Sequence, residues 1–555
     1  MLILSFLFGS GFCTTLILNS QDYSDIISAA AYAKYNNYSY VFALTPNQSV
    51  FLSRYYTLDA DEPIVYLEGD KPILANMKAL LQSSPVKNLN AYSPPNIQFW
   101  IADQLSSDQA ILVGKQYGQD ALSVSSYAAL TGSPIFYLDQ YGDSDALISG
   151  IISRGYSKVI LYGPISEQLS PAQLNLIPQR QIIDTGNRYS NNLEITRMFL
   201  QKQPSEQVMF VSGHAFEKSM VDLKFPLLLA GRSDIPVQLN NFVSQNSIKT
   251  GIVFSGDGDI VDGVNRLKGQ NPQMSFFVKF GEGYRGTTQP LPLVIISLPS
   301  PQISLEVVNL TYNVPAKLFE LRIKNTGDFA AVSAGASISG VGSAQSSQII
   351  MDSGSTTTLS IPLDASAAID SGKIPSVDVT ISYGEDTALM DNIDSITFTE
   401  VQTSFYEDTS EVNLTGVTYS SSEKSFIVTF EGQGWVSGTL GFNINNRPVV
   451  LRIPITNVDG TTQVKIKHLL SSDEESFIRG IAANYFVRSG QKEDILINEI
   501  RGQRQIEVIR VASSPSQTNS ILGLDSIYIF AIAILIIGAI LVFKFFAGDG
   551  GDSFA

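Results

Sequence analysis

A pattern that occurs three times in the first half of the 555-residue chain constrains the fold more than any other feature. Each copy begins with an apolar stretch, followed by a small residue, an aromatic residue and a helical stretch. The aromatic residues are Tyr23, Tyr117 and Phe216. A second apolar stretch in each copy ends at glycine, and these glycines are Gly69, Gly163 and Gly256. Two landmarks that recur at nearly one period indicate a tandem triplication.

Within each copy, apolar strands alternate with helical segments. In the middle copy, AILV (110–113) precedes a helical stretch that the sequence TGSP (131–134) ends, and IFYL (135–138) and KVILYG (158–163) follow. Continuously apolar strands are typical of a sheet buried on both faces. Alternating strands and helices predict a parallel sheet with right-handed crossovers. The predicted fold is therefore three tandem Rossmann-like α/β repeats, over residues 15–90, 91–177 and 178–285.

The glycines that follow the strands raise the question of nucleotide binding. A dinucleotide-binding loop has the spacing G-x-G-x-x-G. The segments GKQYGQD, SQDYSDI and GHAFEKS lack the second and third glycines in two of the three copies. Glycine also tolerates the positive φ of a sharp turn at a strand end. We therefore expect no cofactor and interpret five glycines as turn residues: Gly69, Gly114, Gly163, Gly213 and Gly256.

Residues suited to catalysis or metal binding are few. The chain has one cysteine, Cys13, and two histidines, His214 and His468, which are far apart in the sequence. The segment SGDGDIVDG (255–263) resembles a calcium loop, but Val261 breaks the required spacing of acidic residues. The motifs G-x-S-x-G, H-E-x-x-H and Walker A are absent from the sequence. We expect no catalytic residue, no metal site and no enzyme activity.

The pattern changes in the second half of the chain. After a proline-punctuated linker at 286–300, segments such as FELRIKNTGDFAA and SVDVTISYG alternate apolar and polar residues between Gly, Asn and Ser turns. KSFIVTFEG and QIEVIRV alternate in the same way further on, and Asn445-Asn446 suits a hairpin turn. Period-two alternation predicts antiparallel sheets. We predict two Ig-like β-sandwich domains, over residues 301–401 and 402–512.

Both ends of the chain carry apolar segments. Residues 1–14 are typical of a signal peptide, with a buried first strand as the alternative. The run at 526–543 has no charged residue, and about 20 such residues cross the ~30 Å hydrocarbon layer as a helix. We predict a linker at 513–525, a transmembrane helix at 526–543 and a short cytoplasmic tail at 544–555. The predicted localisation is a single-pass protein of the cell membrane with its ectodomain outside.

Four N-x-S/T sequons agree with an extracellular location and are candidate glycosylation sites. They lie at Asn37, Asn47, Asn309 and Asn413. The formal net charge of -16 argues against a nucleic-acid partner, because phosphates attract Lys and Arg.

The repeats resemble the cell wall binding repeat type 2 family. That family has an apolar strand followed by G-x-x-aromatic-x-D-A-L, and GKQYGQDALSVSSYA supplies Asp120-Ala121-Leu122 after one extra residue. Asp25-Ile26-Ile27 is a looser match, and TGNRYSNNLEI (185–195) is similar to the family's G-x-D-R-Y, with Asn187 in place of Asp. The segments 322–331 and 352–363 resemble CARDB and related Ig-like modules, which are spacers of prokaryotic surface proteins.

The resemblance implies that three modules pack around a pseudo-threefold axis and hold a protein on anionic wall polymers. We therefore predict a membrane-anchored surface protein of a prokaryotic envelope, held out on an Ig-like stalk. Its repeats are expected to bind an envelope polysaccharide or other surface proteins. The alternatives are a surface-layer (S-layer) component that assembles laterally and an extracellular enzyme that uses an α/β cleft.

Ligands of open α/β sheets bind at the carboxyl ends of the strands. Candidate ligand or interface contacts are therefore the polar and aromatic residues at these ends. They are Gln116, Tyr117, Asp120, Arg188 and Tyr189. The alternative for each residue is a role in a turn or in packing between repeats, which suits Tyr189 in particular.

Overall fold

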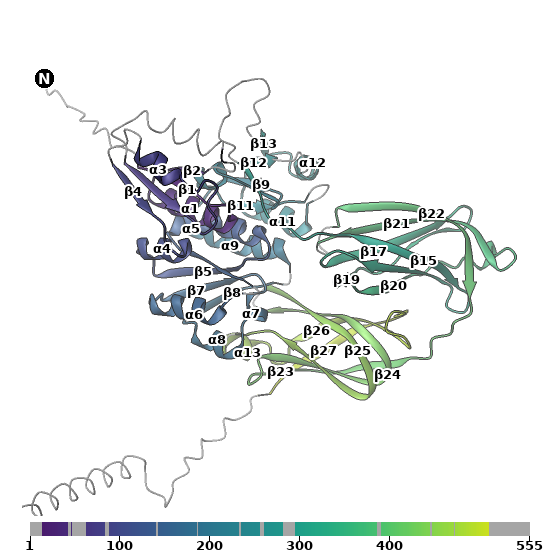
Figure 1. The fold of residues 1–555 in the computed structure, drawn as a ribbon. Helices are drawn as coiled ribbons and strands as arrows, with labels where there is room; N and C mark the ends of the chain where they lie inside the picture. The colour runs from purple at the N-terminus through teal and green to yellow at the C-terminus, as the bar shows by residue number, and fades with distance from the viewer. Residues whose placement is uncertain are drawn as a thin grey trace, which may run out of the picture.

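In the residues that it describes, the computed structural model of the protein contains three four-stranded parallel sheets, two larger sheets and one two-stranded sheet (Figure 1). The structure describes residues 14–42, 46, 63–83, 88–139, 142–185, 187–231, 235–255, 260–280, 295–385, 390–444, 447–470 and 472–509.

The first repeat contains a sheet with the strand order β2-β1-β3-β4. Its elements are β1 (Thr15–Asn19), α1 (Tyr23–Tyr35), β2 (Ser39–Phe42), β3 (Ile64–Glu68), α3 (Met77–Gln82) and β4 (Leu89–Tyr92). The Asp22 side chain caps α1 by accepting a hydrogen bond from the Ser24 backbone N–H. All four strands run parallel, as the apolar strands predict.

The second repeat has the equivalent order, β6-β5-β7-β8, again with parallel strands. Its elements are α4 (Ile97–Gln104), β5 (Gln109–Gly114), α5 (Gly118–Thr131), β6 (Ile135–Leu138), α6 (Ser144–Ser153), β7 (Lys158–Tyr162), α7 (Ile165–Gln168), α8 (Pro171–Leu176) and β8 (Arg180–Ile183). Because β8 pairs with β7, the second sheet extends beyond residue 177.

The third repeat has the order β11-β9-β12-β13. Its elements are α9 (Arg188–Lys202), β9 (Gln207–Val211), β10 (Ala215–Glu217), α10 (Ser219–Asp222), β11 (Leu227–Leu229), α11 (Val237–Gln245), β12 (Thr250–Ser255), α12 (Val261–Gln270) and β13 (Ser275–Phe280). One strand, β14 (Ile295–Ser297), returns from the linker region and pairs antiparallel with β10.

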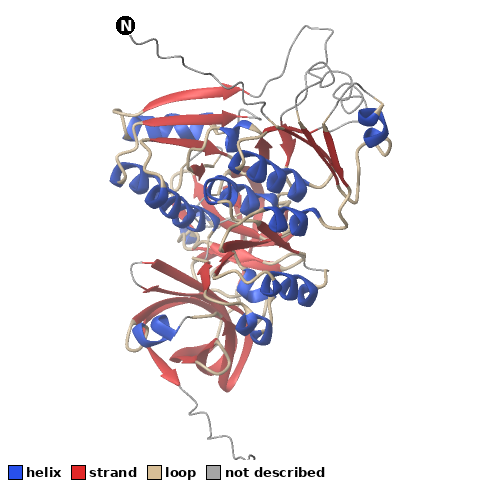
Figure 2. Ribbon diagram, turned by 90° about the vertical axis from the view of Figure 1, so that its left-hand side faces the viewer, coloured by secondary structure: helices blue, strands red, loops and turns tan. Residues whose placement is uncertain are grey.

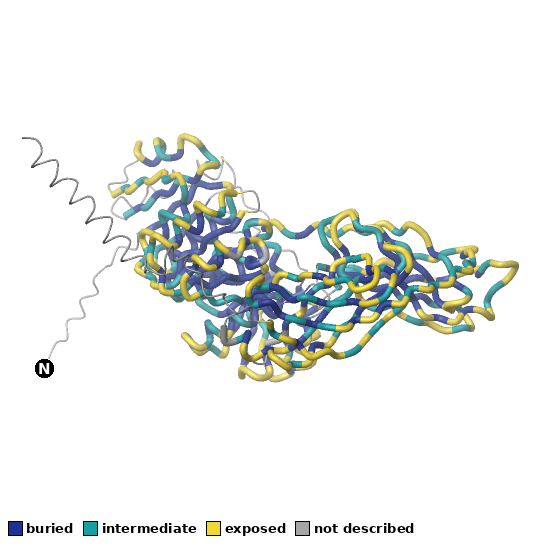
Figure 3. The backbone as a smooth tube through the Cα atoms, turned by 90° about the horizontal axis from the view of Figure 1, so that it is seen from below, coloured by how far each residue is buried: buried dark blue, intermediate teal, exposed yellow. Residues whose placement is uncertain are grey.

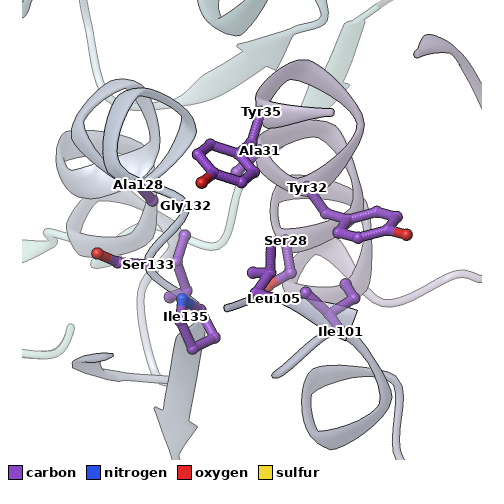
Figure 4. A pocket seen from close by; sticks show the side chains of 11 residues that line it. Ser28, Ala31, Tyr32, Tyr35, Ile101, Leu105, Ala128, Gly132, Ser133 and Ile135 are labelled. Atoms are coloured by element: carbon purple, nitrogen blue, oxygen red, sulfur yellow. The ribbon is translucent and has the colours of Figure 1, made fainter. Parts of the chain in front are cut away.

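The repeats share one hydrophobic core, in which α1 packs against α5 and α5 against α9. Small residues such as Ala29 and Ala128 line these helix contacts and are buried. Gly132 ends α5 with a φ of +69°, and a Cβ there would lie 2.6 Å from the Tyr35 ring. The close approach of Tyr35 to Gly132, shown in Figure 4, therefore joins the first two repeats. Figure 2 shows the helices lying among the sheets of this part.

The first β domain is one sheet with the order β18-β17-β21-β22-β15-β16-β20, with β19 paired to β17. Its strands are β15 (Leu305–Asn313), β16 (Leu318–Asn325), β17 (Ala330–Ile338), β18 (Gly342–Gln345), β19 (Ile349–Met351), β20 (Thr356–Ile361), β21 (Lys373–Gly384) and β22 (Asn392–Ser404). Neighbouring strands are antiparallel, except that β15 and β22 pair in parallel.

The second β domain has the strand order β23-β27-β26-β24-β25. Its elements are β23 (Glu411–Ser420), β24 (Ser425–Ile444), β25 (Arg447–Lys467), α13 (Ser472–Phe477), β26 (Ala482–Gly490) and β27 (Asn498–Ile509). Antiparallel pairing of Ile444 with Arg447 fits the predicted hairpin, although residues 445–446 lie outside the described residues. Both β domains extend from the same side of the repeats in Figure 1, and Figure 3 shows buried residues concentrated inside each part.

The structure does not support the predicted C-terminal transmembrane helix or the single-pass membrane localisation that depends on it. Among the described residues, no helix is both long and apolar enough to cross a membrane. The longest described helix, α9, has 15 residues and carries charged side chains, whereas a span needs about 20 apolar residues. The predicted span at 526–543 and residues 1–13 of the predicted signal peptide lie outside the described residues.

Candidate functional site

A cleft lies where the α/β repeats and both β domains meet, and we call it the three-domain cleft. Its volume is about 880 Å³, within the range of small-molecule sites. The repeats contribute polar residues at the carboxyl ends of the second sheet and at the start of α9. These include Tyr117, Gln119, Asp120, Asp184, Asn187, Arg188 and Asn191. The first β domain adds Phe329, Asp352 and Glu385, and the second adds Arg452, Lys465, Lys467 and His468.

Arg188 is the central side chain of the wall formed by the repeats. Asn187 caps α9 by accepting a hydrogen bond from the Ser190 backbone N–H at 2.8 Å, which fixes where the helix begins. Arg188 then donates to Gln119 Oε1 at 2.6 Å and to the Tyr189 hydroxyl at 2.6 Å. Its guanidinium lies 4.7 Å from the centre of the Tyr189 ring. These contacts hold the arginine in one position.

The same arginine connects the repeats to the first β domain. Arg188 forms an ion pair with Glu385, and the two side chains are only 12% and 10% exposed. His214 Nε2 lies 4.0 Å from the other oxygen of Glu385. Next to this pair, the rings of Tyr117 and Phe329 meet edge to face with centres 6.2 Å apart. One side of the cleft is therefore closed by contacts between residues far apart in sequence.

Asp120 lies in the first turn of α5, with its carboxylate against Gly163. A Cβ at Gly163 would lie 2.9 Å from Asp120 Oδ2, so glycine is needed for this close approach. Burial raises the pKa of Asp120 to about 7; repulsion from Asp184 adds to the rise, and Arg188 opposes it. In the first repeat, Asp25 and Gly69 lie together in the same way. The tandem repeat therefore extends to a carboxylate packed on a strand-end glycine.

Two buried carboxamides complete this wall of the cleft. Gln119 is 7% exposed and Asn191 is 4% exposed. The Asn191 oxygen accepts hydrogen bonds from the Thr185 backbone N–H at 2.7 Å and from the Thr185 hydroxyl at 2.9 Å. The Gln119 oxygen accepts from Arg188, and the Asn191 oxygen accepts from a backbone N–H. Neither an arginine nor a backbone N–H can accept a hydrogen bond, so these contacts fix which end of each amide is the oxygen.

The five predicted contact residues divide into three groups. Tyr117, Asp120 and Arg188 line the cleft. Gln116 does not line the cleft; it is exposed and donates to the Tyr117 hydroxyl at 2.8 Å. Tyr189 is 2% exposed, and its ring packs against the Arg188 guanidinium. It therefore has the packing role that was the alternative to ligand contact.

The predicted turn glycines differ in their constraints. Gly163 and Gly213 have φ values of +80° and +89°. At Gly69, a Cβ would lie 2.6 Å from Ser20 Oγ, whereas at Gly114 it would meet its nearest neighbour at an ordinary 3.8 Å. Gly256 lies outside the described residues.

Three of the predicted sequons have exposed asparagines, at Asn37, Asn309 and Asn413, and Asn47 lies outside the described residues. In the described part of the chain, no group of three or more His, Cys, Asp and Glu residues is arranged to hold a metal ion. The calcium-like segment at 255–263 is described only in part. A second hollow, between α1 and α5 (Figure 4), has a volume of only about 10 Å³ and holds at most one water molecule.

Sequence reasoning missed Gln119, Asn191 and Glu385. Gln119 lies one residue before Asp120 in the same segment, GKQYGQD, so its position next to a predicted contact residue was a signal for it. Asn191 lies four residues after Asn187, about one helical turn, and therefore on the same side of the helix. Glu385 had no signal, because it reaches Arg188 across 197 residues of sequence.

The comparisons with known proteins give weak likenesses. No family model and no curated protein matches the chain. Among solved structures, Cwp6 from Clostridium difficile is 17% identical with a TM-score of 0.35, covering 46% of this chain and 43% of its own. Cwp8 from Clostridium difficile is 16% identical with a TM-score of 0.36, covering 47% and 48%. The chain therefore spans less than half the length of either protein. The periplasmic chaperone SfaE is 9% identical, with a TM-score of 0.14.

Proposed function

We propose that the protein works at the cell surface, where its α/β repeats bind an envelope glycopolymer or a neighbouring surface protein. Its work is binding, without a chemical reaction. The observation that carries this proposal is the three-domain cleft at the carboxyl ends of the second sheet, where open α/β folds place their ligands. The motif resemblance around Asp120 and Arg188 supports the same assignment.

The charge of the cleft favours a polar ligand. Carboxylates of Asp120 and Asp184 lie on the wall formed by the repeats, and Arg452, Lys465 and Lys467 come from the second β domain. Arg452 is paired with Asp352, with Nη2 and Oδ2 2.9 Å apart, and Lys465 with Glu423 at 2.8 Å. The mixed lining suits a ligand that offers many hydrogen-bonding groups.

Co-sedimentation with isolated envelope polysaccharide tests the proposal. We expect the full chain to sediment with the polysaccharide, and soluble polysaccharide to release it by competition. Envelope from which the polysaccharide has been extracted serves as the control. Binding to this extracted envelope indicates a protein partner instead. A chain that stays in solution with every envelope fraction contradicts the proposal.

A further inference from the structure

The wall of the cleft formed by the repeats has amide donors that the protein itself does not use. Within the described part of the chain, neither Gln119 Nε2 nor Asn191 Nδ2 donates a hydrogen bond. Both residues line the cleft, and neither nitrogen is among the fully buried atoms without a partner, so both reach the solvent of the cleft. A ligand that accepts from these nitrogens replaces water at donors that the fold already holds in place, and each such hydrogen bond contributes about 0.5–1.5 kcal/mol net.

A hydrogen-bond acceptor lies beside these donors. Asp120 follows Gln119 in the first turn of α5, which packs against α9, the helix that carries Asn191. The Asp120 carboxylate lines the cleft and accepts no hydrogen bond from the described residues. Asn187 adds a third amide at the same wall, and its oxygen is already used to cap α9. Donors and an acceptor therefore converge from two adjacent helix starts.

The charges and donors of this wall disfavour two simple ligand classes. An anion at this wall meets the carboxylates of Asp120 and Asp184. A bare cation meets the N–H groups of two amides, whose oxygens are engaged elsewhere. A hydroxyl group both donates and accepts hydrogen bonds, so it matches an amide donor and a carboxylate acceptor together.

We propose that Gln119, Asn191, Asn187 and Asp120 bind the hydroxyl groups of a saccharide segment in the three-domain cleft. This inference rests on the proposed function and assigns the site and the chemistry of recognition. Another part of the lining comes from the second β domain, including Lys467. The binding site is therefore composite, and the repeats supply only one of its walls.

A glycan array followed by calorimetric titration tests this assignment with the full chain. The probes are immobilised neutral, amino and acidic oligosaccharides of bacterial envelopes, and the tightest-binding one is then titrated in solution. Gln119→Glu keeps the oxygen that accepts from Arg188 and removes the amide donor. Asn187→Asp keeps the cap of α9 and removes the third donor. We expect each variant to weaken binding by about tenfold.

Gln245→Glu is the matched control, because Gln245 is exposed at the end of α11 and the variant makes the same change of charge. It is expected to bind like the parent chain. Saccharide binding that survives both cleft substitutions overturns the assignment to the cleft and leaves the proposed function standing. A chain that binds no arrayed glycan but sediments with extracted envelope overturns the saccharide assignment only, and a chain that stays in solution with every envelope fraction overturns both. Thermal unfolding of each variant shows whether it is folded.

Discussion

At the residue scale, the raised pKa of Asp120 links the stability of the repeats to pH. The folded chain holds a proton on Asp120 up to about pH 7, whereas an unfolded aspartate releases it near its ordinary value of 3.8. Between these two values the native state binds more protons, so stability falls as pH rises through this window. Asp25 contributes with the same sign, because burial raises its pKa to about 6.

Replacing Asp120 by Asn tests this link. We expect the parent chain to be less stable at pH 8 than at pH 5, by on the order of 1–3 kcal/mol from this residue. Asp120→Asn removes that part of the difference and leaves the part due to Asp25. Urea unfolding at the two pH values measures it. An unchanged pH dependence in Asp120→Asn contradicts the role assigned to the carboxylate.

The Arg188–Glu385 ion pair gives a second prediction. Arg188→Gln and Glu385→Gln each leave one largely buried charge without its main partner, which typically costs about 3–5 kcal/mol. We expect the double variant to be little worse than either single variant, so the coupling energy should be about as large as one single cost, roughly 3–5 kcal/mol. The exposed pair Lys249–Glu206 is the control, and its coupling should stay below about 1 kcal/mol. Equal coupling energies for the two pairs would contradict the role of the Arg188–Glu385 ion pair in holding the repeats to the first β domain.

These residues also show where sequence reasoning stops. Asp120 and Arg188 were found because they lie next to strand ends within a repeated pattern. Asn191 and Gln119 are polar residues near helix starts, where most such side chains serve as caps. Only the structure shows that their amide oxygens already accept hydrogen bonds within the protein, which leaves the amide nitrogens available to a ligand. Glu385 is brought to the cleft by the folding of another domain.

At the scale of the elements, the two glycines at the strand ends of the second repeat are not equivalent. Gly163 follows β7 with a φ of +80°, and a Cβ there would lie 2.9 Å from Asp120 Oδ2. Gly163→Ala is therefore expected to destabilise the chain by about 1–3 kcal/mol. Gly114→Ala, the control at the end of β5, adds a methyl group at ordinary contact distance and should cost less than about 1 kcal/mol.

Chemical unfolding compares the two alanine variants directly. A larger loss in Gly114→Ala would reverse the ranking and show that the strand end after β7 tolerates a side chain. The result also bears on sequence interpretation, since the repeat pattern placed both residues in one class. The pattern located the turns, but φ and the approach of Asp120 decide which of them requires glycine.

The order of the elements was more predictable than their limits. Strands such as β5 and β7 are covered by helices on both faces, so their sequences are continuously apolar and are recognised easily. The fourth strand of the second sheet, β8, is only partly buried and has the sequence RQII, so it carries little apolar signal. The prediction consequently ended that repeat before β8, although β8 pairs with β7.

At the scale of the whole molecule, each β domain contacts the repeats and the two contact each other. Leu469 of the second β domain lies in the hydrophobic cluster of the second repeat. Leu298, just after β14, packs over Gly118, where a Cβ would lie 2.7 Å away. Periodicity along the sequence gives the faces that are buried, but not which domain covers them. The three-domain cleft is therefore a property that only the folded chain reveals.

Arg488 is a buried residue in the contact between the two β domains, which also includes the ion pairs Arg452–Asp352 and Arg322–Asp494. It is 4% exposed in β26 and donates to the Thr358 carbonyl at 2.8 Å and to Ser360 Oγ at 3.2 Å, both in the first β domain. Burial lowers its pKa to about 10, which leaves it charged at neutral pH. Arg488→Met keeps most of the side-chain volume but leaves the Thr358 carbonyl without this donor, so contact between the domains is expected to weaken.

Small-angle X-ray scattering of the full chain measures that change. A larger radius of gyration is expected for Arg488→Met, because loss of the contact lets the β domains separate. Arg501→Met is the control on the neighbouring strand β27, since the Arg501 side chain is 67% exposed and pairs only within its own domain. If the two variants scatter alike, the contact at Arg488 does not hold the domains together. If only Arg488→Met expands, saccharide binding should weaken with it, because the composite cleft needs the part of its lining that the second β domain supplies.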